Sequence, residues 1–413
     1  MSWRTSTWRT EAQVVSGYVL PYRLLAMVSL DKHLEAALAR VESAGRRRVL
    51  RAAQLAPHGR VVREGRALVD FSSNDYLGLA THPLLTERAR EWTARHGTGS
   101  GASRLVTGTS PQVLALEARI AAFKGTQAAL IFASGWQANA AAIPALLSAL
   151  PGAAVFSDRL IHASMHAGLA ISGTRQHRFR HNDLDHLDAL LTSKGGDSPA
   201  RVILTESVFS MDGDVAPMAA LVELAKRHQA LLFVDEAHAT GVMGPRGAGL
   251  SATVPGAVDV VMGTFSKAMG GFGAYVAGSR ALIDWLTNAA SGFVFSTALP
   301  PGVLGAIDAA LDLVPGMDAE RSHLAGLATR LRTGLAELGL DHGASASQIV
   351  PAVIGDEGEA LALATALEAR GLLAAAIRPP TVPPGTSRLR LALRAAHTSD
   401  DIDTLIEAIA TCR

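Results

Sequence analysis

DVVMGTFSKAMGG, residues 259–271, is the stretch around which the rest of the chain is organised. A short apolar run, Val260–Met262, precedes Gly263 and the tetrad Thr264–Lys267, and a glycine pair follows. This pattern predicts a buried strand that ends in a tight loop. A lysine at the end of such a strand is partly desolvated, which lowers its pKa and makes the neutral amine available to a carbonyl group. Alone, the tetrad is better interpreted as a solvated loop lysine, because most lysines lie on the surface.

The upstream run LLFVDEAH, residues 231–238, changes that interpretation because it ends in two carboxylates and a histidine. Lys267 follows Asp235 by 32 residues, which leaves room for one crossover between parallel strands. Open parallel sheets bind ligands at the carboxyl ends of their strands, so we expect both residues to lie in one cleft. A pyridoxal phosphate enzyme needs such a pair: a lysine to carry the cofactor, and a carboxylate to keep its pyridine nitrogen protonated.

Composition limits the classes of partner. The chain has 413 residues, 48% of them hydrophobic, and its 38 basic and 37 acidic residues give a net charge of +1. Such a balance creates no field for nucleic acid or membranes, so we expect small-molecule partners. The single cysteine, Cys412, excludes an intrachain disulfide and a thiolate metal cluster, which fits a cytoplasmic setting. No metal-ligand spacing such as HExxH occurs, and we expect no metal.

The first 26 residues lack a compact apolar segment followed by a cleavage site, so they do not resemble a signal peptide. We expect them to be an extension with little structure. Residues 30–50 are predicted to form a helix with the basic cluster Arg46–Arg48 near its end, where cations suit the helix dipole. Ser110 is predicted to cap a helix that begins at Pro111.

Strand and helix patterns alternate through the middle of the chain. Apolar runs that predict strands occupy residues 67–71, 128–133, 153–156, 201–205, 231–235, 260–262 and 274–277. This alternation predicts an α/β layer fold with a mainly parallel central sheet. Long Ala/Leu-rich helices follow Pro300-Pro301, and the remainder reads as a smaller α+β domain. We therefore divide the chain into an N-terminal extension and helical segment (1–66), a large cofactor-binding domain (67–315) and a small C-terminal domain (316–413).

Two further features point to the cofactor. Gly135 and Trp136 follow a predicted strand and open a helix, and backbone amides at such a terminus bind anions. This is our first choice for a phosphate cradle, whereas the glycine-rich residues 97–108 lack the spacing of a P-loop and are predicted to be a loop. His162 lies just beyond another strand, a position that favours a functional histidine over a structural one.

Taken together, the motifs resemble those of the α-oxoamine synthases, pyridoxal phosphate enzymes of fold type I. The resemblance extends from about Leu34 to the C-terminus and rests on five segments in order: SNDYLGL, TESVFSMDGD, VDEAHATG, TFSKAMGG and AIRPPTVPPGTSRLRLALRAAHT. Several motifs in register are far more specific than any one of them. The resemblance implies a fold like that of aspartate aminotransferase, bound pyridoxal 5'-phosphate, and a cytoplasmic homodimer.

By position in these motifs, the resemblance implies roles for particular residues. Lys267 matches the lysine that binds the cofactor, Asp235 the partner of the pyridine nitrogen, His162 the residue stacked on the ring, and His238 the partner of the phenolic oxygen. The remaining cofactor positions are Gly135, Trp136, Glu206, Ser210, Thr264 and, from a neighbouring subunit, Ser296 and Thr297. The substrate positions are Arg46, Asn74, Arg378 and Thr381.

The AIRPPTVP segment favours the member of the family that condenses L-alanine with a pimeloyl thioester, on CoA or on acyl carrier protein, in biotin biosynthesis. The alternatives are a sister enzyme that uses glycine, of the 2-amino-3-ketobutyrate CoA ligase or 5-aminolevulinate synthase type, and a non-catalytic protein of the same fold. Arg378 is the expected partner of the amino acid's carboxylate, and the prolines beside it hold it stiffly. The motif does not decide which of three adjacent arginines contacts the acyl donor: Arg46, Arg47 or Arg48.

Two positions depart from the family pattern. Ala239 stands where glycine is frequent, and Trp136 stands where phenylalanine or tyrosine is commoner. A phosphate contact made by the backbone survives both changes.

Overall fold

The computed structural model describes residues 22–413. The expectation of little structure over the first 26 residues falls outside the described residues up to residue 21, and it is wrong for residues 22–26, which are helical. The chain divides into two units, one ending at Ala52 and the other spanning Ala53–Arg413. The first holds helix α1 (Tyr22–Ser43).

The predicted helix over residues 30–50 begins and ends too late in the chain. Helix α1 ends at Ser43, and Gly45 adopts a φ of +65° while the Arg46 amide donates to the Val41 carbonyl. A glycine in this left-handed conformation terminates a helix by satisfying its last carbonyl groups. Arg46–Arg48 therefore follow the helix instead of forming its last turn, and the predicted interaction with its dipole is wrong.

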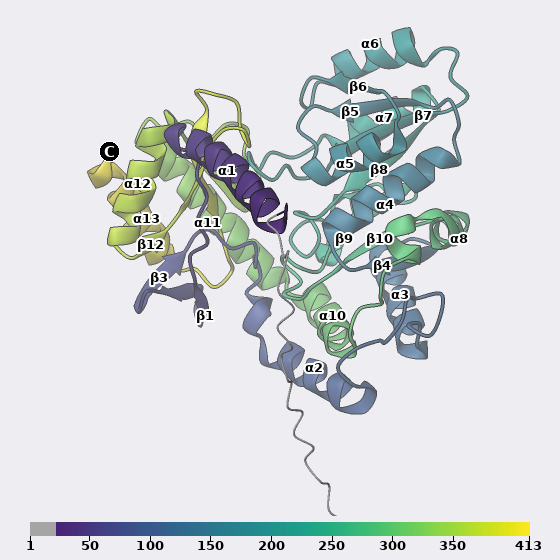
Figure 1. Ribbon diagram of the computed structural model, residues 1–413, viewed down its shortest axis with the longest axis horizontal. Coiled ribbons are helices and arrows are strands. Elements are labelled where there is room, and N and C mark those ends of the chain that lie inside the picture. Colours follow the sequence, from purple (N-terminus) through teal and green to yellow (C-terminus); the bar gives the residue numbers. More distant parts are fainter. Residues whose placement is uncertain (1–21) are drawn as a thin grey trace, which may run out of the picture. The chain divides into compact units, whose positions relative to one another are not determined.

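The second unit is built on a seven-stranded sheet with the strand order β4-β10-β9-β8-β7-β5-β6 (Figure 1). Five adjacent strands are parallel, and β10 runs antiparallel to both β9 and β4. The predicted mainly parallel sheet is confirmed. The strand bounds are β4 (Ala128–Phe132), β5 (Ala154–Asp158), β6 (Gln176–Phe179), β7 (Arg201–Glu206), β8 (Ala230–Asp235), β9 (Val260–Thr264) and β10 (Ala274–Gly278).

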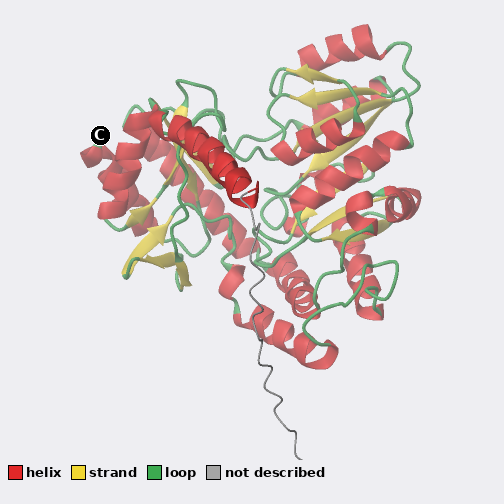
Figure 2. Cartoon of the chain, in the orientation of Figure 1, coloured by secondary structure: helices red, strands yellow, loops and turns green. Residues whose placement is uncertain are grey.

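Helices cover both faces of this sheet, which is why its central strands are mainly apolar (Figure 2). Alternate residues of the central strands enter separate cores, as β7 illustrates: Val202 and Leu204 pack with one set of helices and Ile203 with the other. The first set is α4 (Gly135–Ser148), α5 (Ala163–Ser172) and α8 (Arg280–Ala289); the second is α6 (Leu184–Gly195) and α7 (Met218–Arg227).

A third core joins the remaining elements. A three-stranded sheet has the order β11-β14-β13, and a four-stranded sheet, β1-β2-β3-β12, pairs the start of this unit with a strand near its end. The strand bounds are β1 (Gln54–Ala56), β2 (Arg60–Arg63), β3 (Arg66–Asp70), β11 (Ile349–Gly355), β12 (Leu372–Leu373), β13 (Ala375–Ile377) and β14 (Ser387–Ala392). The remaining helices are α2 (Pro83–His96), α3 (Pro111–Lys124), α9 (Ser291–Val294), α10 (Pro301–Leu313), α11 (Asp318–Glu337), α12 (Glu357–Ala369) and α13 (Ser399–Cys412).

Individual expectations can be compared with these bounds. Ser110 caps α3 by accepting a hydrogen bond from the Val113 amide, and Pro111 is its first residue, as predicted. Residues 97–108 form neither helix nor strand, also as predicted, although Ser103 makes a single β-bridge to Thr297. The domain boundaries at residues 66 and 315 stay predictions. Within the described residues, no helix combines the length and the apolar character needed to cross a bilayer.

The sheet aligns three chemically important strand ends. In the parallel register Glu206 pairs with Asp235, and Asp235 pairs with Met262, so β7, β8 and β9 end side by side. Lys267 follows the end of β9 by three residues. Strand β9 requires glycine at position 263, because a Cβ there would lie 2.3 Å from the Tyr275 hydroxyl oxygen.

Candidate active site

Lys267 lies in a loop that buried neighbours hold in place. The Phe265 amide donates to the Gly273 carbonyl at 2.9 Å, the Gly270 amide donates to the Lys267 carbonyl at 2.9 Å, and Phe265 is buried. Lys267 itself is half-buried. Loss of water lowers the pKa of its ammonium group to about 8, and the carboxylates of Asp235 and Glu206 only partly oppose this. Lys267 thus lies just beyond a strand end, as the sequence predicts.

Asp235 is held as a hydrogen-bond acceptor at both carboxylate oxygens. It is 3% exposed. The amide nitrogen Nδ2 of Asn139 donates to Oδ2 at 2.8 Å, and the Ala237 backbone amide donates to Oδ1 at 2.9 Å. Both carboxylate oxygens thus serve as acceptors, as the partner of a protonated nitrogen requires.

The same Asn139 connects Asp235 to His162. Its Nδ2 also donates to Ser164 Oγ at 3.0 Å, and that hydroxyl lies 2.7 Å from His162 Nδ1. The His162 side chain is exposed and meets the edge of the Trp136 ring, with 6.3 Å between centroids. The structure thus brings His162 and Asp235 into one network, linked by two residues that the sequence did not single out.

Glu206, at the end of β7, is a buried acid with an unpaired oxygen. Its Oε1 has no hydrogen-bond partner within the described chain. Burial, and next the negative charge of Asp235, raise the pKa of Glu206 well above its usual value. A carboxyl group in this environment binds a proton more readily than an exposed glutamate does.

A second network joins His238 to the C-terminal part of the chain. The Tyr76 hydroxyl lies 2.6 Å from His238 Nδ1 and donates to Asn74 Oδ1 at 3.0 Å. Arg390 donates to the same Asn74 oxygen at 3.1 Å and to the Ser210 carbonyl at 2.5 Å. Burial lowers the pKa of His238 well below its usual value, and the charges of Lys267 and Arg390 lower it further. His238 is therefore neutral at physiological pH.

The N-terminus of α4 has the features of a phosphate cradle. Ser134 caps the helix by accepting from the Gln137 amide, and a Cβ on Gly135 would lie 2.8 Å from the Thr264 methyl group. The Thr264 hydroxyl oxygen is buried without a partner in the described chain. A free buried hydroxyl beside helix amides suits an anion. With Lys267 and Asp235 at neighbouring strand ends, these residues fit pyridoxal phosphate.

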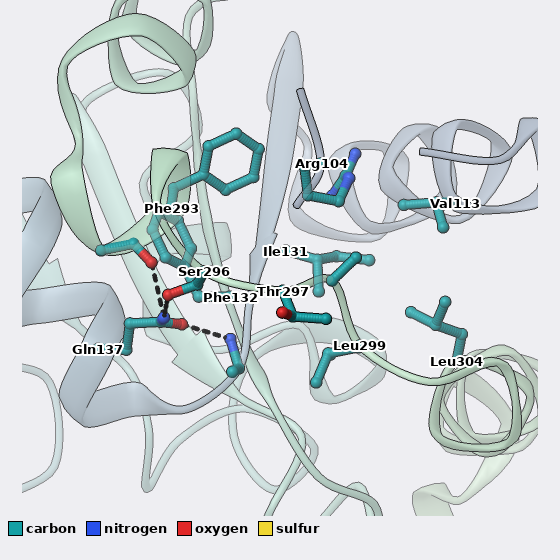
Figure 3. Close-up of a pocket in the computed structure, with 13 residues that line it drawn as sticks. Arg104, Val113, Ile131, Phe132, Gln137, Phe293, Ser296, Thr297, Leu299 and Leu304 are labelled. Carbon is teal, nitrogen blue, oxygen red and sulfur yellow. Dashed lines mark hydrogen bonds between the residues drawn. The ribbon is translucent and has the colours of Figure 1, made fainter. Parts of the chain in front are cut away.

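Ser296 and Thr297 lie beside the first turn of α4 in the same chain (Figure 3). Gln137 Nε2 donates to Ser296 Oγ at 2.7 Å and to the Gly292 carbonyl at 2.6 Å. Thr297 and the adjacent Phe295 are exposed. The expected contribution of Ser296 and Thr297 to a neighbouring subunit's phosphate site stays a prediction.

Three of the predicted substrate residues, Asn74, Arg378 and Thr381, belong to the second unit. Arg378 is half-buried, its carbonyl accepts from the Thr381 amide at 3.1 Å, and Thr381 is exposed. Arg46 is exposed and belongs to the first unit. Asn74, by contrast, is part of the network with His238.

Sequence reasoning missed four residues of the site: Tyr76, Asn139, Ser164 and Arg390. Tyr76 and Arg390 lay inside quoted motifs but received no role. Asn139 carried a usable signal, since it is the one polar side chain among the alanines of residues 138–142. Ser164 carried none, because serine near a helix start is usually only a cap.

Comparison with known proteins agrees with this geometry. A model of the family "Aminotransferase class I and II" matches residues 66–409. The chain therefore belongs to the class I and II aminotransferase family. Among its curated relatives is the 8-amino-7-oxononanoate synthase of Gluconacetobacter diazotrophicus, which is 62% identical over 84% of this chain and 89% of the relative. The enzyme of the same name from Anaeromyxobacter dehalogenans is 51% identical over 84% of this chain and 86% of the relative.

Solved structures agree as well. Serine palmitoyltransferase of Sphingomonas wittichii has a TM-score of 0.84 at 29% identity, covering 93% of this chain and 96% of that one. The 8-amino-7-oxononanoate synthase of Francisella tularensis has a TM-score of 0.72 at 26% identity, covering 83% and 97%. The predicted fold type I architecture, the pyridoxal phosphate cofactor and the class of pyridoxal phosphate-dependent acyltransferase are confirmed.

Proposed function

We propose that this enzyme condenses L-alanine with a pimeloyl thioester, releasing carbon dioxide and free CoA or carrier protein and forming 8-amino-7-oxononanoate for biotin biosynthesis. The observation that carries the chemistry is the half-buried Lys267 amine beside Asp235, at the ends of neighbouring strands. The names of relatives up to 62% identical support the choice of substrates.

Bound pyridoxal phosphate supplies an electron sink that acidifies the α-proton of the amino acid. Lys267 Nζ then removes that proton. Its lowered pKa suits this task, because a base works best when its pKa lies near the working pH. Asp235 keeps the proton on the pyridine nitrogen, since its own oxygens only accept hydrogen bonds in this structure. Neutral His238 provides a polar contact without adding charge.

The amino acid's carboxylate needs a cation close to the base. Arg378 was predicted for this role, and we propose that Arg390 shares it. Arg390 is buried, is aimed by Asn74 Oδ1 and the Ser210 carbonyl, and its charge is one of those that lower the pKa of Lys267. An arginine pre-positioned in this way binds a carboxylate with little loss of entropy.

We also propose that the enzyme works as a homodimer in which Ser296 and Thr297 complete the partner's phosphate site. The hydrogen bond from Gln137 fixes Ser296 at the first turn of α4, next to the exposed Phe295 and Thr297. An exposed phenylalanine beside polar groups is typical of a surface that another subunit covers.

A panel of donors and amino acids tests the substrates. The purified holoenzyme is assayed for thiol release with alanine plus pimeloyl-CoA, alanine plus pimeloyl-carrier protein, glycine plus acetyl-CoA, and glycine plus succinyl-CoA. We expect the alanine pairs to have the highest kcat/KM. Glycine should react slowly but measurably, because one methyl group contributes only about 1–3 kcal/mol of discrimination. Faster turnover with a glycine pair would assign the enzyme to a sister activity.

A further inference from the structure

Asn139 is a fully buried polar side chain that the proposed chemistry does not yet use. It is 0% exposed and projects from α4 between the end of β8 and the start of α5. Its single amide nitrogen donates to Asp235 Oδ2 and to Ser164 Oγ, whereas its Oδ1 has no partner within the described chain. Only the nitrogen end of an amide can face an ionised carboxylate, so this orientation is determined by Asp235.

The direction of every hydrogen bond beyond Asn139 follows from that orientation. The Ser164 hydroxyl accepts from Asn139, so its own proton is free to go to His162 Nδ1, 2.7 Å away. The Ser164 backbone amide, which can only donate, also points at Nδ1 from 3.2 Å. Nδ1 therefore carries no proton, and the neutral imidazole of His162 holds its hydrogen on Nε2.

We propose that Asn139 is a positioning residue that sets the proton arrangement on both sides of the cofactor: it holds Asp235 as an acceptor and, through Ser164, fixes His162 as the Nε2–H tautomer. The inference rests on the roles proposed above for Asp235 and His162. One buried amide thus controls the hydrogen bonds of both Asp235, the proposed partner of the pyridine nitrogen, and His162, the proposed residue at the ring face. Asn139 itself need touch neither the cofactor nor the substrate.

Replacement of Asn139 by aspartate gives the sharpest test. A protonated aspartate has the shape of asparagine and one O–H donor, so it can still donate to Asp235. A carboxyl group next to a buried anion has a raised pKa, and it loses this proton only as the pH rises. Two facing carboxylates then repel each other. Asn139→Asp should therefore behave almost like the wild type at acidic pH and fail at alkaline pH.

The measurement is the dissociation constant of pyridoxal phosphate from the apo-protein, by equilibrium dialysis at pH 6 and pH 9, with the wild type as reference at each pH. We expect Asn139→Asp to bind within about fivefold of the wild type at pH 6 and more than about tenfold more weakly at pH 9. Asn139→Leu, which cannot donate, should bind roughly 10- to 100-fold more weakly at both pH values, the usual effect of losing a hydrogen bond to a buried charged group.

Asn288→Asp is the matched control, because it makes the same substitution at an exposed residue of α8, whose side-chain amide donates to the Asp284 carbonyl. It should match the wild type at both pH values. Equal weakening of Asn139→Asp at pH 6 and pH 9, or wild-type binding by Asn139→Leu, would overturn the proposal. If Asn139→Leu does not fold, as thermal unfolding of the apo-protein would reveal, the pH dependence of the isosteric aspartate decides. No substrate is used, so failure of the substrate proposal would leave this result unchanged.

Discussion

The lowered pKa of Lys267 predicts an amine of unusual reactivity near neutral pH. With a pKa of about 8, about 24% of Lys267 is neutral at pH 7.5, whereas a lysine at the ordinary value of 10.5 is only about 0.1% neutral. The neutral fraction, and with it the rate of reaction with an electrophile, should thus be about 200-fold higher. The rate should rise with pH and level off above about pH 8.

Pulse labelling of the apo-protein with acetic anhydride, followed by peptide mass spectrometry, measures this rate. Exposed Lys226 in the same sample corrects for decay of the reagent. Two substitutions should move the midpoint in opposite directions. Asp235→Asn removes an anion that raises the pKa of Lys267 and should shift the midpoint to lower pH, whereas Arg390→Ala removes a cation that lowers it and should shift the midpoint to higher pH.

The reasoning would be refuted by a wild-type labelling rate that continues to rise to pH 10, because Lys267 would then be an ordinary solvated lysine. Shifts of the same sign in both variants would also contradict it, since they would show a general loosening of the loop instead of an effect of charge. Circular dichroism of each variant checks that the fold is kept.

Three further outcomes are expected. Arg390→Ala and Arg378→Ala should each raise KM for alanine roughly 10- to 100-fold, because each loses a charge-assisted hydrogen bond, and Arg390→Ala should also lower kcat. If steady-state kinetics show an unchanged KM in both variants, neither arginine binds the carboxylate. Mixing inactive Thr297→Ala and Lys267→Ala proteins should restore activity if the site is shared between subunits, because each mixed dimer keeps one intact site; no recovery speaks against sharing. His181 is held between Asp158 and Asp214, which raises its pKa to about 10; its charged form therefore stabilises the fold fully below about pH 6.5, and this effect is lost as the pH rises to about 10. In denaturant unfolding, His181→Gln should lower the free energy of unfolding by about 3–5 kcal/mol at pH 6 and by much less at pH 10. An equal loss at both pH values would disprove the ionic role.

The core of the site could be predicted because its signals are local. An apolar run followed by Asp235, and a second run followed by Lys267, each predict a buried strand with a functional residue at its end, and the spacing predicts that the strands are neighbours. The C-terminal end of helix α1 was harder to predict, because residues 44–50 continue a helical composition and only the conformation of Gly45 ends the helix.

The partners of the arginines could not be predicted for a different reason. Arg388 and Arg390 lie two residues apart on β14 and face the same way, but Arg388 bonds Asp212 whereas Arg390 bonds Asn74 and Ser210. These partners lie 176 to 316 residues earlier in the chain. Nothing in the local pattern RLRLAL distinguishes the arginine that reaches the site from the one that supports a turn, because tertiary packing makes that choice.

The pairing of β3 with β12 bears on how the protein matures during synthesis. The segment from Val69 to Tyr76 obtains several of its backbone partners from residues 371–395: the Phe71 amide donates to the Leu373 carbonyl, and the Ala395 amide donates to the Tyr76 carbonyl. A ribosome therefore releases almost the whole large sheet before Asn74 and Tyr76 can take their places beside Arg390. Contacts so distant in sequence form slowly, so activity should appear only after the last residues have left the exit tunnel. Nascent and prematurely terminated chains are accordingly unable to start the reaction.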